Sequence, residues 1–252
     1  MPALAPTFSQ RFTTILDFLY PPKCTACGTP LFSEPGRRVC ARCVARVEMV
    51  PNPRCEICGG PLESASSDST KCARCLAHPP RYRIARTIAR YRTTAEDEPG
   101  TLPALIRRHK YGLDQSVGRA LVEYLGDELP VSAGDYDVVI PVPLHWRRLW
   151  WRGFNQAALL AAEVAHRLNL PLDTTAMSRR RYTPPQTSQH HDERIKNMRR
   201  AFVVTNPERI KNRRVLIVDD VMTTGATVDE CARVLLQAGA TSVDVFTLAR
   251  VL

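Results

Sequence analysis

Apolar residues recur along the last two thirds of the chain in patterns that predict strands. The segment ARTIARY (85–91) alternates between apolar and polar residues, as a strand does. Apolar residues run on in YDVVIPVP (136–143) and RVLIVDD (214–220), which is typical of strands buried in a parallel sheet. Further strands are expected at AFVVT (201–205) and SVDVFTLAR (242–250).

Segments in which apolar residues have helical spacing lie between these strands. This spacing is found in LPALIRRHKYG (102–112), GFNQAALLAAEVAHRLN (153–169) and ATVDECARVLLQAGA (226–240), and a Gly or Asn lies near the end of each. Residues 215–249 therefore predict a strand, a helix and a second strand in one crossover unit. The expected fold class is α/β, with a mostly parallel sheet flanked by helices.

The N-terminal third has a different texture. Residues 1–80 are rich in Cys, Pro, Arg and Ser, with a helix-like stretch at 1–20 and little apolar periodicity afterwards. Such a region cannot bury much of a core by itself, so bound metal would have to contribute to its folding. We expect two domains, at 1–80 and 81–252.

Composition agrees with a globular protein, since 44% of the 252 residues are hydrophobic and 24% are charged. The longest apolar run, Ala157 to Ala162, is far too short to span a bilayer. The first twenty residues lack the basic and continuous apolar segments of a signal peptide. We expect a cytoplasmic protein without membrane insertion.

The formal charge of +10 is concentrated near the N-terminus. Residues 1–92 hold 14 Lys and Arg against 6 Asp and Glu, and the rest of the chain holds 21 against 19. Zinc bound to thiolates reduces this excess, because eight thiolates and two zinc ions together remove four positive charges. The basic face is real but smaller than the sequence suggests.

Eight of the nine cysteines form four C-x-x-C pairs, and the gaps between paired knuckles are 12 and 13 residues. In a reducing compartment this spacing indicates zinc rather than disulfides. CGTP and CGGP recur after the first knuckle of each half, which favours a duplicated module. The simplest interpretation is two four-cysteine sites: Cys24, Cys27, Cys40, Cys43, then Cys55, Cys58, Cys72, Cys75.

We expect both zinc ions to be structural, because a site of four thiolates is closed to substrate. A redox role is disfavoured, since no pair opens a helix within a βαβ pattern. The ninth cysteine, Cys231, is expected to be a small buried residue. Six arginines near the knuckles either contact nucleic-acid phosphates or form a solvated basic face: Arg37, Arg38, Arg42, Arg46, Arg54 and Arg74. Aromatic residues that could stack on bases are scarce there, with only Phe32 and Tyr82 nearby.

The stretch VLIVDDVMTTGAT (215–227) places Asp219 and Asp220 at the carboxyl end of an expected central strand, where open α/β folds bind ligands. The next turn enters a helix, so backbone N–H groups and three threonine hydroxyls form an anion cradle. Two carboxylates can accept hydrogen bonds from a sugar diol and lie near a ligand-borne Mg²⁺. Phosphate, ribose and metal together describe phosphoribosyl pyrophosphate (PRPP). In the alternative, the Asp pair only caps the helix, which needs one carboxylate rather than two.

This stretch resembles the PRPP-binding motif of type I phosphoribosyltransferases. The chain as a whole resembles the ComF family of competence-associated, phosphoribosyltransferase-like proteins. The similar segments are PVPLHWRRLWWRGFNQAALLA (141–161), TPPQTSQHHDERIKNMRRAF (183–202), RRHKYG (107–112) and the cysteine-rich N-terminal zinc ribbons. The resemblance implies a phosphoribosyltransferase-like fold preceded by a double zinc ribbon.

By this resemblance Asp219 and Asp220 hold the ribose hydroxyls, and they would be the catalytic pair of an active transferase. The resemblance also implies 5′-phosphate and pyrophosphate contacts from two loops: Thr223, Thr224, Gly225, Ala226 and Thr227, then Pro141, Val142, Pro143 and Leu144. Arg152 is placed to meet an anion at a helix start or is a surface arginine. The basic segment 178–200 is expected to be a lid over pyrophosphate, with a solvated or nucleic-acid-facing loop as its alternative.

Two functions follow from these features. One is a PRPP- and Mg²⁺-binding protein that contacts single-stranded DNA and the DNA-uptake machinery during natural transformation, as the family resemblance implies. The other is an active phosphoribosyltransferase that moves the pentosyl group of PRPP to a nitrogenous base. The sequence does not name that base.

Overall fold

The structure is a computed structural model that describes residues 21–32, 36–62, 70–92, 101–111, 115–126, 129–181 and 200–252. The expected helix at 1–20 and most of the basic segment 178–200 lie outside the described residues.

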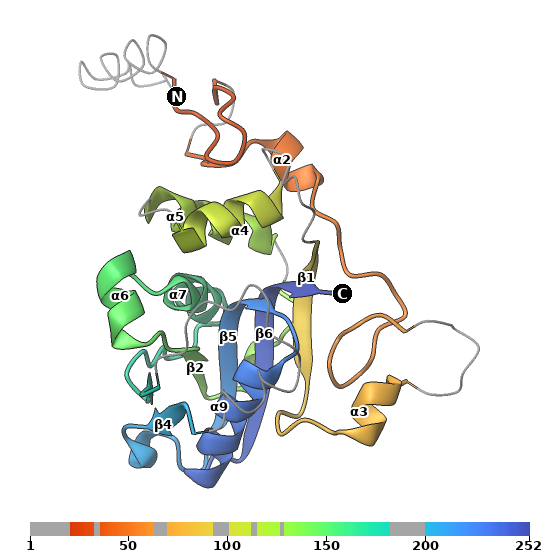
Figure 1. The fold of residues 1–252 in the computed structure, drawn as a ribbon, viewed down its shortest axis with the longest axis vertical. Helices are drawn as coiled ribbons and strands as arrows, with labels where there is room; N and C mark the ends of the chain where they lie inside the picture. Colours follow the sequence, from red (N-terminus) through yellow and green to blue (C-terminus); the bar gives the residue numbers. More distant parts are fainter. Residues whose placement is uncertain are drawn as a thin grey trace, which may run out of the picture.

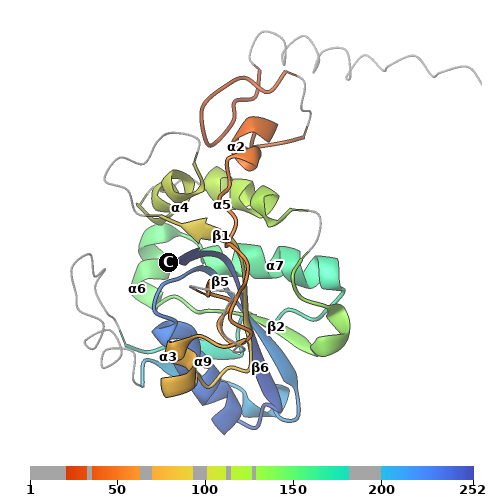
Figure 2. The same ribbon diagram turned by 90° about the vertical axis from the view of Figure 1, so that its right-hand side faces the viewer.

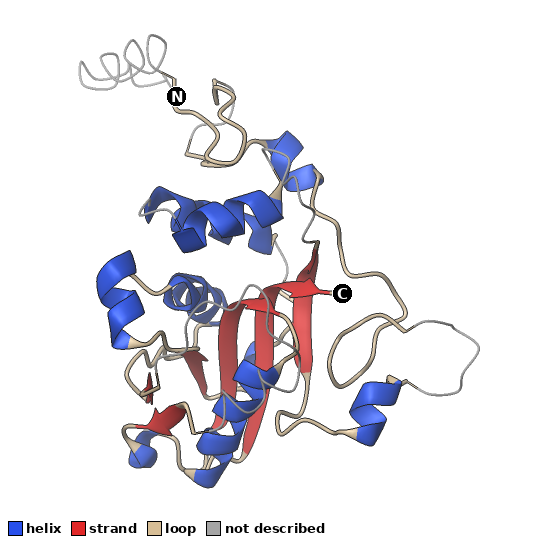
Figure 3. Ribbon diagram, in the orientation of Figure 1, coloured by secondary structure: helices blue, strands red, loops and turns tan. Residues whose placement is uncertain are grey.

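Four parallel strands form the main sheet (Figures 1 and 3). They are β1 (Ala85–Tyr91), β2 (Val138–Pro141), β5 (Arg214–Met222) and β6 (Ser242–Val251), in the order β1-β6-β5-β2. The predicted parallel sheet is therefore confirmed, with β5 in its interior. The prediction that this strand ends at Asp220 was wrong, because β5 continues for two more residues.

Helices cover both faces of this sheet (Figures 2 and 3). On one face, α4 (Leu102–Tyr111), α5 (Gln115–Val122) and α7 (Gln156–Leu168) share an apolar cluster with Leu216 and Val218 of β5. On the other face, α9 (Ala226–Gln237) packs with Val215 and Ile217 of the same strand. Residues 215–218 are apolar at every position because β5 is buried on both of its sides. Cys231 is fully buried on α9, as expected.

Side chains at its ends set the limits of α7. The Asn155 side chain accepts a hydrogen bond from the backbone N–H of Ala157 at 3.2 Å, so the helix begins after Asn155 and not at Gly153. Asn169 ends the helix with a positive φ of 51°. A separate short helix, α6 (Trp146–Arg152), precedes it, and neither α6 nor α5 was predicted.

A second, antiparallel pair of strands joins β3 (Met177–Arg179) to β4 (Phe202–Val204). The backbone N–H of Arg180 donates to the carbonyl of Ala201 at 2.8 Å. The two ends of the segment 178–200 are therefore held side by side. Three short 3-10 helices complete the described elements: Glu123–Leu125, Ala133–Asp135 and Pro207–Arg209.

The cysteine-rich residues form a first ribbon (22–45), which contains α2 (Ala41–Ala45), and a second ribbon (53–77), which contains α3 (Ala73–Ala77). Figure 1 shows α2 above α4, whereas α3 lies lower, beside the sheet. The Glu123 carboxylate accepts hydrogen bonds from the backbone N–H groups of Arg38 at 2.6 Å and Val39 at 3.0 Å, which ties the first ribbon to the end of α5. A domain boundary near residue 80 stays a prediction. Within the described part of the chain, no helix has the length and apolar character needed to cross a bilayer.

Candidate functional site

The turn at residues 223–227 leads from β5 into α9 at the carboxyl edge of the sheet. Gly225 has φ +80°, and a Cβ added there would lie 2.8 Å from Cε of Met222. The Thr224 hydroxyl oxygen accepts a hydrogen bond from the backbone N–H of Ala226 at 3.3 Å. Because the first N–H groups of an α-helix lack intrahelical partners and carry partial positive charge, this turn suits an anion.

Asp219 and Asp220 lie within β5, where successive side chains project to opposite faces. Asp220 is 8% exposed and Asp219 is half-buried. Each carboxylate accepts a hydrogen bond from the next backbone N–H, at 2.9 Å for Asp219 and 2.7 Å for Asp220. The N-cap of α9 is Gly225, which makes no side-chain cap bond. Neither Asp therefore occupies the N-cap position of α9.

The loop at residues 141–144 lies beside the Asp pair. Pro141 pairs with Val218, and the backbone N–H of Val142 donates to the carbonyl of Val218 at 2.9 Å. The Asn155 side chain donates to the carbonyl of Val142 at 3.0 Å and ties the loop to the start of α7. The structure thus brings this loop, the Asp pair and the following turn to one edge of the sheet. Arg152, the last residue of α6, is half-buried.

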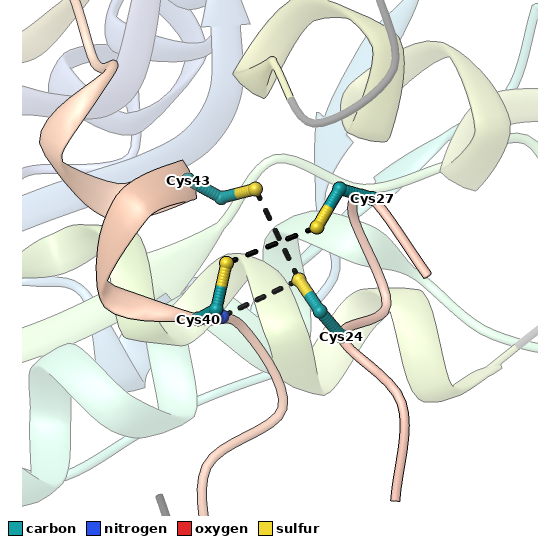
Figure 4. A group of neighbouring side chains, drawn as sticks. All are labelled: Cys24, Cys27, Cys40 and Cys43. Carbon is teal, nitrogen blue, oxygen red and sulfur yellow. Dashed lines mark hydrogen bonds between the residues drawn. The ribbon is translucent and has the colours of Figure 1, made fainter. Parts of the chain in front are cut away.

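The paired cysteines gather in two groups of four, as predicted from their order. In the first group (Figure 4), the Sγ atoms of Cys24 and Cys43 are 4.0 Å apart, and those of Cys27 and Cys40 are 3.8 Å apart. Four sulfurs bound tetrahedrally at about 2.3 Å from zinc are about 3.8 Å from one another. The first group therefore fits a zinc ion.

The second group repeats this geometry. The Sγ atoms of Cys58 and Cys72 are 3.8 Å apart. In each group the backbone N–H of the third cysteine donates to Sγ of the first at 3.3 Å, from Cys40 to Cys24 and from Cys72 to Cys55. The predicted duplication is confirmed at the level of individual hydrogen bonds. Four thiolates fill a tetrahedral shell, so both sites suit structural zinc.

Two family models match the chain, a double zinc ribbon domain over residues 15–76 and a phosphoribosyl transferase domain over residues 155–252. The DNA utilization protein YhgH of Salmonella typhimurium is 35% identical over 223 residues, which cover 85% of this chain and 89% of that protein. Competence protein F of Haemophilus influenzae is 30% identical over 224 residues, which cover 84% and 90%. The chain belongs to the ComF family.

One solved structure similar to this ComF-family chain is the purine phosphoribosyltransferase from Pyrococcus horikoshii. It is 22% identical, with a TM-score of 0.31 over 58% of this chain and 73% of that one. The matched phosphoribosyl transferase domain, the parallel sheet and the two cysteine groups confirm the predicted fold class.

A cavity of about 530 Å³ separates the second ribbon from the turn at 223–227. Thr224, Gly225 and Ala226 line one side of it, and Arg74 and Cys75 of α3 line another. The Asp pair and residues 141–144 do not line this cavity. The sequence did not predict it, because its two walls are about 150 residues apart in the chain.

Two arginines join the second ribbon of this ComF-family chain to the candidate site. The Arg74 guanidinium donates a hydrogen bond to the carbonyl of Thr224. The Arg250 guanidinium donates to the carbonyl of Cys58, lies 3.6 Å from its Sγ, and lies 3.8 Å from Sδ of Met222. The side chain of Arg250 therefore links Cys58, a predicted zinc ligand, to Met222, the residue directly before the turn at 223–227.

These contacts change the interpretation of the basic residues near the knuckles. Arg54 donates to the carbonyls of Val50 and Thr87, so its charge holds the fold together. Tyr82 is 5% exposed and cannot stack on a base, whereas Phe32 is 65% exposed. The solvent-exposed arginines in the first ribbon and directly after it are Arg37, Arg42 and Arg46.

Proposed function

We propose that this chain binds PRPP together with Mg²⁺ and acts in DNA uptake during natural transformation, in contact with single-stranded DNA and the uptake machinery. The main support for this ligand is the segment from β5 through the turn to α9, which places two carboxylates beside an anion cradle. The names of the relatives, DNA utilization protein and competence protein, support the biological setting.

Each part of the edge has a role in this proposal. Backbone N–H groups and hydroxyls of residues 223–227 hold the 5′-phosphate. The carboxylates of Asp219 and Asp220 accept hydrogen bonds from the ribose hydroxyls, and residues 141–144 with Arg152 hold the pyrophosphate. Bound Mg²⁺ would offset the negative charge of that pyrophosphate.

Because Asp219 and Asp220 project to opposite faces of β5, the two carboxylates are not equivalent in this proposal. Asp219 is the more exposed and is the better placed to meet the ligand directly. Asp220 is buried and bonded to the backbone, so part of its role is to keep the strand end in shape. We therefore expect the larger loss of ligand affinity from replacing Asp219.

A second candidate is turnover, favoured by the match to a phosphoribosyl transferase domain. In this candidate a base nitrogen forms the new bond to C1 of the ribose while the bond to pyrophosphate breaks. Pyrophosphate release on offering nitrogenous bases, with zinc-replete protein, tests it. A cytoplasmic location is also part of the proposal, since reduced cysteines suited to zinc persist in a reducing compartment.

Calorimetry with PRPP and Mg²⁺ tests the binding proposal. Asp219→Asn and Asp220→Asn keep the side-chain size but remove the charge, and losing a charge-assisted hydrogen bond costs about 1.5–3 kcal/mol. We expect a tenfold to hundredfold loss of affinity in the double variant. Asp137→Asn is the matched control, because Asp137 lies at the amino end of β2, bonded to Arg214 at the start of β5. Unchanged affinity in the double variant would overturn the proposal.

A further inference from the structure

Helix α6 lies at the periphery of the molecule (Figure 1), and three of its tryptophans are exposed to solvent. Trp150 is 85% exposed, Trp146 is 64% exposed and Trp151 is 55% exposed. Burying an indole is strongly favourable, so a cluster of exposed tryptophans indicates a contact surface. The helix follows directly on the loop at residues 141–144, which places this surface next to the proposed ligand site.

Basic side chains are interleaved with the tryptophans. At 3.6 residues per turn, Trp146 and Trp150 lie on one side of the helix, and Arg147 falls between Trp150 and Trp151. The Arg147 guanidinium carbon lies 5.3 Å from the ring centre of Trp146. The apolar and basic residues of α6 therefore do not form two separate faces.

The positive charge extends from α6 to the end of β3. A backbone bridge joins His145 to Arg179, so residues 177–181 lie beside the start of the helix. Burial, and then the charge of Arg148, lower the pKa of Arg179, as expected of two arginines near each other. Residues 145–152 and 177–181 together contain six arginines and no acidic residue, and the nearby charge of Asp219 acts on Arg179. This surface attracts a polyanion.

We infer that this surface, which we call the tryptophan–arginine face (residues 145–152 and 177–181), contacts single-stranded nucleic acid. The inference deepens the DNA part of the proposed function and rests on it. Indole rings stack on unpaired bases, and guanidinium groups meet the phosphates between them. A duplex keeps its bases stacked on one another, so the exposed indoles select for single strands.

Other partners fit this face less well. A helix that lies in a membrane interface separates an apolar face from a basic one, and Arg147 interrupts such a face here. The centre of a protein interface is depleted of charge, whereas Trp146 and Trp151 each have an arginine beside them in the chain. Rings with arginines among them match the bases and phosphates of a single strand.

Fluorescence anisotropy with labelled oligo(dT), on full-length zinc-replete protein, tests the inference. Removing one stacked ring costs a single-stranded complex about 1–3 kcal/mol, so Trp150→Ala should weaken binding roughly fivefold to a hundredfold. Trp150→Phe should retain most of the affinity. Met49→Ala is the control, because it removes an exposed apolar side chain that lies outside the tryptophan–arginine face and should change nothing.

Further measurements separate this inference from the proposal beneath it. Oligo(dT) should quench tryptophan fluorescence of the wild-type protein, and a duplex of the same length should quench it less. If oligo(dT) binds the wild type with a steep salt dependence but Trp146→Ala and Trp150→Ala both bind it unchanged, the face is wrong and the DNA proposal stands. If the wild type binds no oligo(dT) at low salt, both are overturned. Loss of binding to anionic vesicles in Trp150→Ala, with DNA affinity intact, would make the face a membrane contact and also overturn the inference.

Discussion

Replacing Gly225 with Ala should weaken binding of PRPP much more than it weakens the fold. A residue other than Gly costs about 1–2 kcal/mol at the positive φ of +80° that Gly225 adopts. The new methyl group would also meet Cε of Met222 at 2.8 Å. Met222 is 3% exposed, but its Cε is the end of a flexible side chain that borders the cavity of about 530 Å³, so the methyl group can shift. The main cost of the substitution is therefore that of the positive φ.

The turn can relieve this strain locally when no ligand is bound, and the ligand must then restore the strained conformation. A restoring cost of about 2 kcal/mol, the upper end of the range for the positive φ, corresponds to roughly a thirtyfold loss of affinity. Calorimetry with Mg²⁺ and PRPP measures it, and ribose 5-phosphate should weaken in parallel because the turn is expected to hold its phosphate.

Gly36→Ala is the control for this experiment. Gly36 has nearly the same φ, +81°, but an added Cβ has no heavy atom within 4 Å. It should lower the thermal midpoint slightly and leave PRPP affinity unchanged. If Gly225→Ala binds PRPP as tightly as the wild type, residues 223–227 do not form the phosphate site.

Two further predictions concern metal and pH. Elemental analysis should find about two zinc ions per chain, and Cys24→Ser and Cys72→Ser should each lose one of them. Only Cys72→Ser should also weaken PRPP binding, because the second ribbon contacts Thr224. Hydrogen bonds from Arg214 hold the pKa of Asp137 at about 2, below its ordinary value, so the stability from this pair is present above about pH 4 and is lost as the pH falls through about 2. Asp137→Asn should therefore lower the unfolding free energy at pH 7 by up to about 1 kcal/mol, after allowance for solvent screening, and this difference should vanish in acid titrations followed by circular dichroism.

The sequence predicted the elements whose burial repeats regularly. The predicted strand ARTIARY has the same bounds as β1, and the predicted helix at 226–240 differs from α9 only at its end. The two groups of four cysteines were predicted completely, because tetrahedral coordination of zinc imposes a spacing that survives any surrounding fold.

The sequence did not predict the features that depend on long-range contacts. WRRLWWR has only seven residues, too few for its apolar spacing to have predicted α6, and the exposure that makes its tryptophans a candidate surface is visible only in the structure. The strand with the Asp pair was expected to end at those acids, but pairing of Val221 and Met222 with β6 extends it. The contacts of Arg74 and Arg250 join residues 150 and 192 positions apart, and periodicity carries no signal for them.

The two ribbons repeat the same internal bonds yet contact different neighbours, and thermodynamic linkage gives this difference a consequence. The first ribbon is tied to Glu123, at the far end of α5, whereas the second is tied through Arg74 to the carbonyl of Thr224. If a ligand that orders the turn at 223–227 strengthens the hold of zinc at the second site, that zinc must strengthen the hold of the ligand by the same factor. Zinc bound at the first site would not be coupled to ligand binding in this way. The two ribbons would then respond differently to scarce zinc. Loss of zinc from the first ribbon would lower only stability, whereas loss of zinc from the second ribbon would also lower ligand affinity.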